Sequence, residues 1–430
     1  MRYYSLNHNS KHSSFADAVI KGLAPDRGLY FPERIPILPK NFFENIEDMS
    51  IPEIALKVIK PYIGNEINNN KLLEIVKETL DFEFPLVKIN DNISALELFQ
   101  GPTLAFKDVG ARFMARSIGH LNKESKEKIT VLVATSGDTG GAVANGFLGV
   151  EGVNVVILYP RGKVSEIQEK QLTTLGQNIT ALEVDGVFDD CQEMVKNAFL
   201  DSGLSSVQLT SANSINVARW LPQMFYYFIA YRALKQKNKK LVFSVPSGNF
   251  GNICAGLMGQ QMGLPINHFI ACTNLNDSVP RYLKTGNYEP LPTKQTISNA
   301  MDVGNPSNFI RIQTIFNNDI VKMKKTFSGY SYTDNETKKA LKEIYAKNQY
   351  VADPHGAVGY LGLKKFLSRE KKDFYGVFLE TAHPVKFIDT VEKTLKLKLP
   401  IPEHLKETLS KKKVSIPIKD YSELRSYLLD

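Results

Sequence analysis

Cysteine is scarce in this sequence of 430 residues. The three cysteines, Cys191, Cys254 and Cys272, are odd in number, lie far apart and form no C-x-x-C pair. This pattern favours neither a disulfide framework nor a zinc site. Histidine is rare as well, and the one close pair, His8 and His12, lies in a polar segment. We therefore expect no bound metal and a reducing compartment.

Long apolar runs are also absent. The longest strand-like stretch, residues 153–159, contains Asn154, and a membrane-spanning helix needs about 18 or more consecutive apolar residues. Residues 1–8 lack the apolar core of a signal peptide. These absences predict a protein without a membrane partner and with a cytoplasmic location.

Several catalytic motifs are missing. The sequence contains no G-x-G-x-x-G and no G-x-x-x-x-G-K-[ST], so dinucleotide-dependent dehydrogenases and P-loop enzymes lose their main support. It contains no H-E-x-x-H and no G-x-S-x-G, which disfavours metalloproteases and serine hydrolases.

The charge balance is basic but not extreme. Hydrophobic residues make up 43% and charged residues 23%, as in ordinary globular proteins, and 53 Lys and Arg against 45 Asp and Glu give a net charge of +8. The lysines lie on helical faces such as residues 235–240, without the interleaved aromatics of a nucleic-acid surface. We expect no nucleic-acid partner, although a polyanion-binding protein with strongly salt-dependent affinity remains an alternative. A small anionic substrate also suits this charge.

The order of elements predicts an α/β protein of about three units. The first 90 residues are punctuated by proline and begin with a predicted helix over residues 15–23. Strands then alternate with helices, which is typical of parallel sheets. The predicted strands are residues 129–134, 153–158, 179–184, 207–210, 241–245, 268–272 and 374–379.

We expect two parallel-sheet α/β layers around a cleft, preceded by an N-terminal accessory region. The predicted boundaries are 1–90 for the accessory domain, 91–125 with 235–400 for the large α/β domain, 126–234 for the smaller α/β domain, and 401–430 for a C-terminal tail.

Two strand-to-helix junctions are rich in Gly, Ser and Thr. They cover residues 134–141 and 246–252. At such a junction, free backbone N–H groups and the positive end of the helix dipole attract phosphate. Glycines that only permit a tight turn are the alternative for either loop alone, but two such loops in one chain favour phosphate binding.

One lysine is placed for covalent chemistry. Lys107 lies in the apolar segment LELFQGPTLAFKD, residues 96–108, at a predicted helix start. Burial and the helix terminus both lower the pKa of a lysine there, and a neutral amine is what imine formation needs. A salt bridge from Lys107 to Asp108, or to a carboxylate across the loop, is the alternative. A nucleophilic lysine together with a phosphate cradle points to pyridoxal phosphate as the cofactor.

Two further segments carry polar groups. Residues 211–220 offer amides, hydroxyls and Arg219, whose planar fork suits a second phosphate, although a surface arginine near a helix start is the alternative. Residues 380–384 follow a predicted strand, and residues beyond the carboxyl ends of strands face the ligand crevice in open α/β sheets.

Together these segments resemble the threonine synthase family. The similar motifs, in the same order and spacing, are GLYFP at 28–32, LELFQGPTLAFKD at 96–108, TSGDTG at 135–140, YPRGK at 159–163, SANSIN at 211–216, VPSGNFGN at 245–252 and TAHP at 381–384. The resemblance covers roughly residues 3–400.

The resemblance implies a fold-type II pyridoxal-phosphate enzyme of the tryptophan synthase β-like fold. It also implies the conversion of O-phospho-L-homoserine and water to L-threonine and phosphate, the last step of threonine biosynthesis. Lys107 is the Schiff-base lysine by this resemblance. The implied cofactor contacts are Asp138, Gly248, Asn249, Phe250, Gly251, Asn252 and Thr381, and the implied contacts to the substrate phosphate are Thr135, Ser136, Thr139, Asn213, Ser214 and Arg219.

Asp138 departs from the pattern of many relatives, which carry Asn beside the phenolic oxygen of the cofactor. An ionised carboxylate there repels a phenolate unless a proton is shared. The competing activities within the same fold are a threonine or serine ammonia-lyase and another β-replacement enzyme. We expect a monomer or a weak homo-oligomer.

Overall fold

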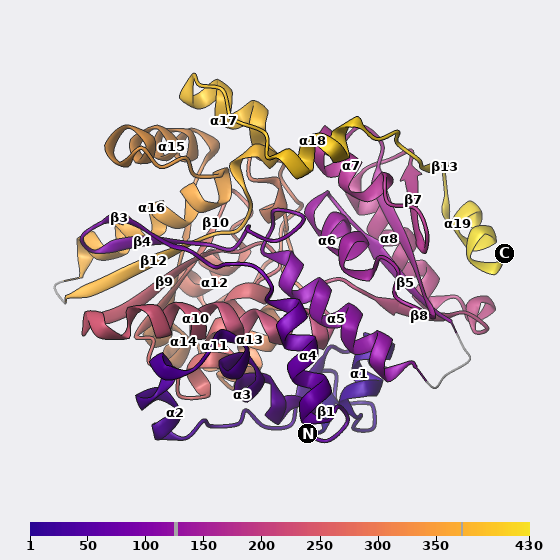
Figure 1. Ribbon diagram of the computed structural model, residues 1–430, viewed down its shortest axis with the longest axis horizontal. Coiled ribbons are helices and arrows are strands. Elements are labelled where there is room, and N and C mark those ends of the chain that lie inside the picture. Colours follow the sequence, from indigo (N-terminus) through magenta and orange to yellow (C-terminus); the bar gives the residue numbers. More distant parts are fainter. Residues whose placement is uncertain (124–127, 371–372) are drawn as a thin grey trace.

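Two β-sheets form the framework of the computed structural model, which describes residues 1–123, 128–370 and 373–430. Figure 1 shows the six-stranded sheet on one side of the molecule and the five-stranded sheet on the other. The predicted α/β architecture of two largely parallel layers is confirmed.

The six-stranded sheet has the order β11-β10-β9-β12-β4-β3, and all neighbours are parallel except the antiparallel pair β3 and β4. Its strands are β3 (Leu86–Asn90), β4 (Ile93–Glu97), β9 (Lys240–Pro246), β10 (His268–Thr273), β11 (Phe327–Ser331) and β12 (Phe374–Glu380). Phe243 and Val245 pack into one core and Val242 packs into the core on the other face. This sheet is therefore covered on both faces, as parallel sheets require.

The five-stranded sheet has the order β13-β7-β6-β5-β8 and is parallel throughout. Its strands are β5 (Ile129–Ala134), β6 (Val153–Pro160), β7 (Ile179–Val184), β8 (Gln208–Ser211) and β13 (Ile416–Ile418). All six residues of β5 are buried, because helices cover both faces. Such a continuous apolar run is what made this strand predictable.

Helices fill the space around and between the sheets. Those of the N-terminal region and the junction are α1 (Phe15–Lys21), α2 (Lys40–Glu44), η1 (Ile46–Asp48), α3 (Ile51–Ile63), α4 (Asn69–Thr79) and α5 (Lys107–Leu121). Those beside the five-stranded sheet are α6 (Asp138–Phe147), α7 (Glu166–Thr173), α8 (Phe188–Leu200) and η2 (Ser202–Leu204).

Most of the remaining helices belong to the six-stranded layer, whereas the last two pack on α7 and α8 beside the five-stranded sheet. They are α9 (Val217–Trp220), η3 (Leu221–Met224), α10 (Phe225–Leu234), η4 (Lys235–Lys237), α11 (Gly251–Gln261), α12 (Ser278–Thr285), η5 (Asn299–Met301), α13 (Phe309–Ile315), α14 (Ile320–Thr326), α15 (Asp334–Asn348), α16 (Pro354–Arg369), η6 (Pro384–Phe387), α17 (Ile388–Leu395), α18 (Glu403–Ser410) and α19 (Tyr421–Leu429).

The predicted strands all appear within one or two residues of their expected ends. The predicted first helix is α1, and Ser14 caps it by accepting from the N–H of Asp17. Four strands of the two large sheets were not predicted from the sequence, namely β3, β4, β11 and β13. Of these, β3, β11 and β13 lie at sheet edges and are partly exposed, so they lack the apolar runs of central strands.

The accessory region and the domain boundaries differ in detail from expectation. Residues 1–90 contain a small sheet of β1 (Tyr3–Ser5) and β2 (Tyr30–Pro32) besides helices, and β3 already belongs to the six-stranded sheet. Helix α10 packs against α3 and η3 rather than against the five-stranded sheet. The predicted boundary between residues 125 and 126 lies outside the described residues.

The C-terminal segment, residues 401–430, which we predicted as a tail, contains regular secondary structure. Residues 401–430 form α18, β13 and α19, and β13 pairs with β7 to extend the five-stranded sheet. Helix α19 packs on α8, where Leu424 joins the core of that layer. The physical reason is that the apolar side chains of α19 cover one face of a sheet that would otherwise face water.

Leu424→Ala is expected to destabilise the protein by about 2–5 kcal/mol, because it leaves a cavity in this core. Leu424 is 0% exposed, whereas Leu429 in the same helix is 44% exposed. Leu429→Ala therefore serves as the matched control, with little expected change. Urea and thermal unfolding of the two variants measure the difference, and equal stability of both would contradict the packing of α19.

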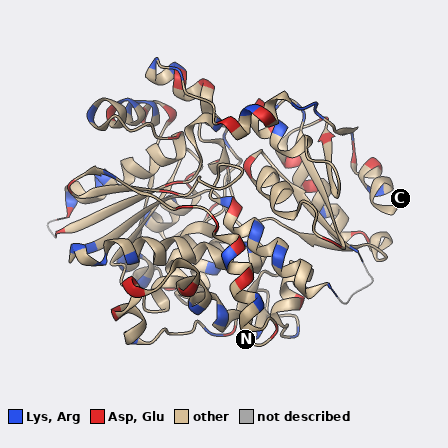
Figure 2. Ribbon diagram, viewed as in Figure 1, with Lys and Arg blue, Asp and Glu red and all other residues tan. Residues whose placement is uncertain are grey.

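Charge is spread over the surface. Figure 2 shows basic and acidic residues interspersed along the helices. Many exposed lysines pair with a carboxylate one turn away, as Lys40 does with Glu44 and Lys406 with Glu403. Within the described part of the chain, no helix is long and apolar enough to cross a membrane.

Candidate active site

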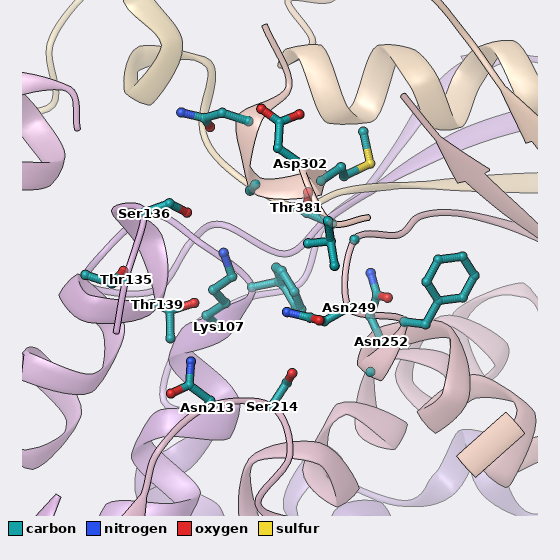
Figure 3. A pocket seen from close by; sticks show the side chains of 18 of the residues that line it. Lys107, Thr135, Ser136, Thr139, Asn213, Ser214, Asn249, Asn252, Asp302 and Thr381 are labelled. Atoms are coloured by element: carbon teal, nitrogen blue, oxygen red, sulfur yellow. The ribbon is translucent and has the colours of Figure 1, made fainter. Parts of the chain in front are cut away.

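A pocket lies where the carboxyl ends of both sheets converge. It is lined by segments that follow β5, β8, β9 and β12, together with the start of α5. Figure 3 shows Lys107 in the middle of this pocket, with Thr135, Thr139 and Asn249 around it. The predicted site residues that line it are Lys107, Thr135, Ser136, Thr139, Asn213, Ser214, Arg219, Gly248, Asn249, Phe250, Gly251, Asn252 and Thr381. Asp138 lies just behind Lys107 and is 4% exposed.

Lys107 is the first residue of α5, and the turn before it is firmly held. Asp108 accepts from the N–H of Thr103 at 2.9 Å and from its hydroxyl at 2.5 Å. Leu104 adopts a left-handed conformation, with φ of 57°, which is strained for a branched residue. The N–H of Phe106 donates to the carbonyl of Thr381 at 2.9 Å. The turn is thereby tied to the end of β12.

Of the two salt bridges considered as alternatives, the one from Lys107 to Asp108 is not formed, but Lys107 does have a carboxylate neighbour, Asp138. The Nζ atom of Lys107 faces the Oδ2 atom of Asp138 at 3.8 Å, and the lysine side chain is 17% exposed. Burial lowers the pKa of Lys107, Asp138 raises it, and the cations of Lys386 and Arg219 lower it again; the net pKa lies below the usual value. Lys107 is thus suited to act as a neutral amine.

The loop of residues 246–252 presents unpaired backbone N–H groups at the start of a helix, as far as the described part of the chain shows. Phe250 has φ of 61° and precedes α11 without a side-chain cap. Within the described residues, the N–H groups of residues 248–252 have no carbonyl or side-chain acceptor. Asn252 instead donates its amide to the carbonyl of Pro246 at 2.8 Å, which shapes the loop. Free N–H groups at the start of an 11-residue helix suit a phosphate.

A second polar surface faces this loop from the five-stranded layer. The hydroxyl oxygen of Thr135 accepts from the N–H groups of Gly137 and Gly140 at 2.9 and 2.8 Å, which leaves its own proton for another acceptor. Ser214 accepts from Asn308 at 3.2 Å and also retains its proton. Hydroxyls and amides therefore converge on the pocket from residues 135–139 and 213–214.

Arg219 is buried rather than on the surface. It is 3% exposed and donates through Nη1 to the carbonyl of Ala212. Its Nε atom has no hydrogen-bond partner in the described structure, and burial lowers its pKa to about 10. A buried guanidinium with a spare donor and no bound carboxylate is suited to an anionic ligand.

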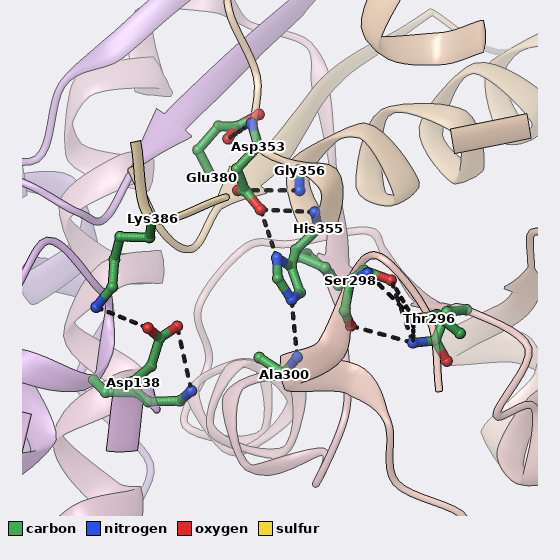
Figure 4. A network of polar contacts seen from close by, with 12 residues as sticks. Asp138, Thr296, Ser298, Ala300, Asp353, His355, Gly356, Glu380 and Lys386 are labelled. Atoms are coloured by element: carbon green, nitrogen blue, oxygen red, sulfur yellow. Dashed lines mark hydrogen bonds and ion pairs between the residues drawn. The ribbon is translucent and has the colours of Figure 1, made fainter. Parts of the chain in front are cut away.

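A network beside Thr381 was not found by sequence analysis (Figure 4). The Nδ1 atom of His355 donates to Asp353 at 2.6 Å, because its Nε2 atom accepts from the N–H of Ala300 at 3.2 Å. Burial and the charge of Asp353 raise the pKa of Glu380 well above its usual value. The network fixes η5 through the N–H of Ala300. Helix η5 packs so closely on Gly248 that a Cβ on this glycine would lie 2.6 Å from the carbonyl oxygen of Ala300.

Two buried cations were also missed. Arg311 stacks on Trp220 at 4.3 Å and donates to the carbonyl of Ile215 at 2.6 Å, which holds the loop before α9. Lys386 forms an ion pair with Asp138 at 2.7 Å. A lysine between Val385 and Phe387 in an otherwise apolar segment was the available signal for Lys386, whereas nothing in its local sequence marks Arg311.

Comparisons with known proteins agree with this geometry. The family model described as "Pyridoxal-phosphate dependent enzyme" matches residues 85–375, and models described as "Threonine synthase N terminus" and "Threonine synthase, C-terminal" match residues 2–80 and 356–427. Threonine synthase of Buchnera aphidicola subsp. Acyrthosiphon pisum is 45% identical over the whole of both chains.

Solved structures show the same likeness. The crystal structure of threonine synthase from Escherichia coli has a TM-score of 0.93 and 41% identity, covering 100% of this chain and 99% of that one. Threonine synthase from Brucella melitensis, solved with bound pyridoxal phosphate, has a TM-score of 0.94 and 34% identity, covering 100% and 98%. A fungal L-serine ammonia-lyase, at 11% identity and a TM-score of 0.56, shares the fold alone. With all three models and full-length relatives in agreement, the chain belongs to the threonine synthase family of pyridoxal-phosphate-dependent enzymes.

Proposed function

We propose that this protein converts O-phospho-L-homoserine and water to L-threonine and inorganic phosphate, with pyridoxal phosphate as cofactor. The observation that carries the proposal is one pocket with a low-pKa lysine, Lys107, between two separate groups of phosphate donors. An ammonia-lyase or a sulfhydrylating enzyme has no phosphate on its substrate and needs only one such group. The full-length similarity to threonine synthases supports the same choice.

The residues fit the cofactor. The unpartnered N–H groups of residues 248–252 and the start of α11 suit its phosphate. Thr381, on the segment after β12, presents a neutral hydroxyl for the pyridine nitrogen, and the amine of Lys107 lies in the same pocket. When bound, pyridoxal phosphate supplies an aldehyde that binds an amine covalently and a ring that accepts the electron pair of a carbanion.

Lys107 carries the proton transfers in this proposal. Its Nζ atom would hold the cofactor at rest and, when free, would take the proton from the α-carbon of the substrate as a general base. For the atoms to balance, one proton also leaves the β-carbon, phosphate leaves the γ-carbon, and the γ-carbon gains a proton to become the methyl group. The hydroxyl of water adds at the β-carbon with release of its other proton, and a proton returns to the α-carbon. A neutral amine of lowered pKa is needed for the first of these steps.

The second donor group holds the leaving phosphate. It comprises Thr135, Ser136, Thr139, Asn213, Ser214 and Arg219. Arg219 contributes the full positive charge, and the hydroxyls of Thr135 and Ser214 have protons to donate. The negative charge that develops on the departing phosphate is thereby stabilised.

The test is to incubate the holoenzyme with O-phospho-L-homoserine and to measure phosphate and threonine together. Equal amounts of both products are expected. L-Threonine, L-serine, and O-acetyl-L-serine with sulfide serve as comparison substrates, with much slower turnover expected. Keto acid and ammonia as the main products from serine or threonine, without threonine formation from the phosphorylated substrate, would establish the ammonia-lyase instead.

Gly248→Ala is expected to weaken cofactor binding by at least about tenfold, because a displaced phosphate cradle loses aligned contacts. The new Cβ would lie 2.6 Å from the Ala300 carbonyl and 3.0 Å from the Cα of Met301. Gly359→Ala is the control, since its nearest contact would be an ordinary 3.4 Å. Fluorescence titration of the apoprotein with pyridoxal phosphate measures both, and unchanged affinity in Gly248→Ala would contradict the assignment of this loop.

We also propose that the enzyme is cytoplasmic and that it is a monomer or a weak homo-oligomer. The three cysteines are buried and free, which suits a reducing compartment. Analytical ultracentrifugation over a range of protein concentrations tests the oligomeric state.

A further inference from the structure

Lys386 is a buried cation beneath the pocket. It belongs to η6, its side chain is 0% exposed, and its ammonium lies 2.7 Å from the Oδ1 atom of Asp138. It also donates to the carbonyl of Thr103, in the turn before Lys107, at 2.8 Å. A buried ammonium is costly unless it is paired. These two contacts therefore place Lys386 in one defined position.

Asp138 divides its two oxygens between two lysines. Its Oδ1 atom receives the close contact from Lys386 and a hydrogen bond from the amide of Gln168 at 2.9 Å. Its Oδ2 atom faces the Nζ atom of Lys107 at the longer distance of 3.8 Å. Figure 4 shows the ammonium of Lys386 directed at the carboxylate of Asp138. Asp138 is thus oriented by residues that do not line the catalytic pocket beside Lys107.

This arrangement resolves a conflict of charges. A carboxylate beside Lys107 would by itself favour the ammonium form, which cannot act as a nucleophile or base. Burial raises the pKa of Asp138, but Lys386, Lys107 and the hydrogen bonds outweigh it, so its pKa lies below the usual range. The positive charge of Lys386 also disfavours a second positive charge on Lys107.

Other charged groups surround these three side chains. Arg219 from α9 lowers the pKa of Lys107. Asp108 from α5 and His383 from the segment after β12 also lie within electrostatic range of Lys386. Burial lowers the pKa of His383 to about 4, so it is neutral near pH 7. Lys386 is the cation in direct contact with Asp138 by its short ion pair.

We propose that Lys386 is a positioning residue that holds Asp138 as an oriented carboxylate and prevents it from keeping Lys107 protonated. The inference rests on the proposed function, in which Lys107 acts as a neutral amine. It also accounts for a carboxylate at the position beside the cofactor's phenolic oxygen: the ammonium of Lys386 neutralises the charge that would otherwise repel that oxygen.

The experiment titrates Lys107 in the full-length apoprotein. Amine labelling at graded pH, with the extent of modification at Lys107 read by mass spectrometry, gives the midpoint of its deprotonation. In Lys386→Met the midpoint is expected to rise by about one pH unit or more, because one repelling cation is lost and Asp138 is released to pair with Lys107. Lys386→Arg, which retains the charge, is expected to keep the midpoint nearer to that of the wild type.

The double variant Lys386→Met with Asp138→Asn separates the effect of charge from the effect of packing. It removes the positive charge of Lys386 and the negative charge of Asp138 together, so the labelling midpoint of Lys107 is expected to return toward that of the wild type. Lys398→Met is the control, since the side chain of this lysine is 91% exposed to solvent and pairs with Glu392 rather than with Asp138. In the holoenzyme of Lys386→Met, the acid limb of the plot of kcat against pH is expected to move to higher pH, as the labelling midpoint does. KM is expected to change little.

An unchanged midpoint in Lys386→Met would overturn the inference, as would a double variant that remains as shifted as the single one. The labelling needs no turnover. If wild-type enzyme fails to release phosphate from O-phospho-L-homoserine, the proposed function fails, whereas the titration of Lys107 still decides whether Lys386 controls its protonation.

Discussion

Lys107→Ala is expected to lower the rate of phosphate release from O-phospho-L-homoserine by at least about 10³-fold, because the general base and the covalent anchor of the cofactor are lost together. The amine is the first residue of α5 and lies in the centre of the pocket. The variant is also expected to lose the absorbance of lysine-bound cofactor. Steady-state kinetics and absorbance spectra of purified protein measure both effects.

Lys88→Ala is the control for this substitution, because Lys88 is an exposed lysine that pairs with Asp91. Wild-type activity is expected for it. Borohydride reduction of the wild-type holoenzyme should attach the cofactor at Lys107, as peptide mapping would show. Cofactor attached to another lysine, or normal turnover by Lys107→Ala, would rule out the proposed role of this residue.

Arg219→Ala is expected to raise KM for O-phospho-L-homoserine roughly 10- to 100-fold, because a charge-assisted contact contributes about 1.5–3 kcal/mol. Arg219 lines the pocket and has a free Nε donor, so the loss falls on the anion that it binds. Inorganic phosphate should weaken as an inhibitor in the same proportion. The KM of Arg219→Lys is expected to lie between those of the wild type and Arg219→Ala, since lysine keeps the positive charge but lacks the planar guanidinium.

Arg161→Ala is the matched control, because Arg161 is 48% exposed and pairs loosely with Glu183 at 3.7 Å. Because Arg219 also donates to the carbonyl of Ala212, cofactor affinity and the melting temperature of Arg219→Ala are measured alongside. A KM within about twofold of wild type in a folded, cofactor-loaded variant would exclude Arg219 from the phosphate site.

Local structure could be predicted best from the sequence. The strands β5 and β9 are largely apolar runs bounded by turns, and a parallel sheet buries such runs on both faces. The two Gly-rich junctions were recognisable because a strand, a tight turn and a helix start are adjacent in the chain. These two junctions do line one pocket.

The C-terminal segment shows where local pattern was insufficient. Helix α19 and strand β13 are short, and their sequences do not indicate where they pack. Their positions follow from tertiary contacts, because α19 packs on α8 and β13 pairs with β7. The same holds for Arg311, whose partners are the carbonyls of Tyr30 and Ile215. A backbone carbonyl has no sequence signature, so its buried partner cannot be inferred from residue spacing.

By itself, the sequence determined the α/β layers, the family, and the lysine and the two Gly-rich loops that line the pocket, because each depends on neighbours within one strand-turn-helix unit. The tertiary structure alone decided which charges meet. Lys386 and Thr103 are 283 residues apart in the chain and in hydrogen-bond contact in the fold. The sequence showed that the negative charge of Asp138 needs a compensating group. Only the fold showed that this group is Lys386 of η6, which forms an ion pair with Asp138 at the start of α6. Electrostatic energy depends on distance through a buried medium, and the order of residues along the chain does not fix that distance.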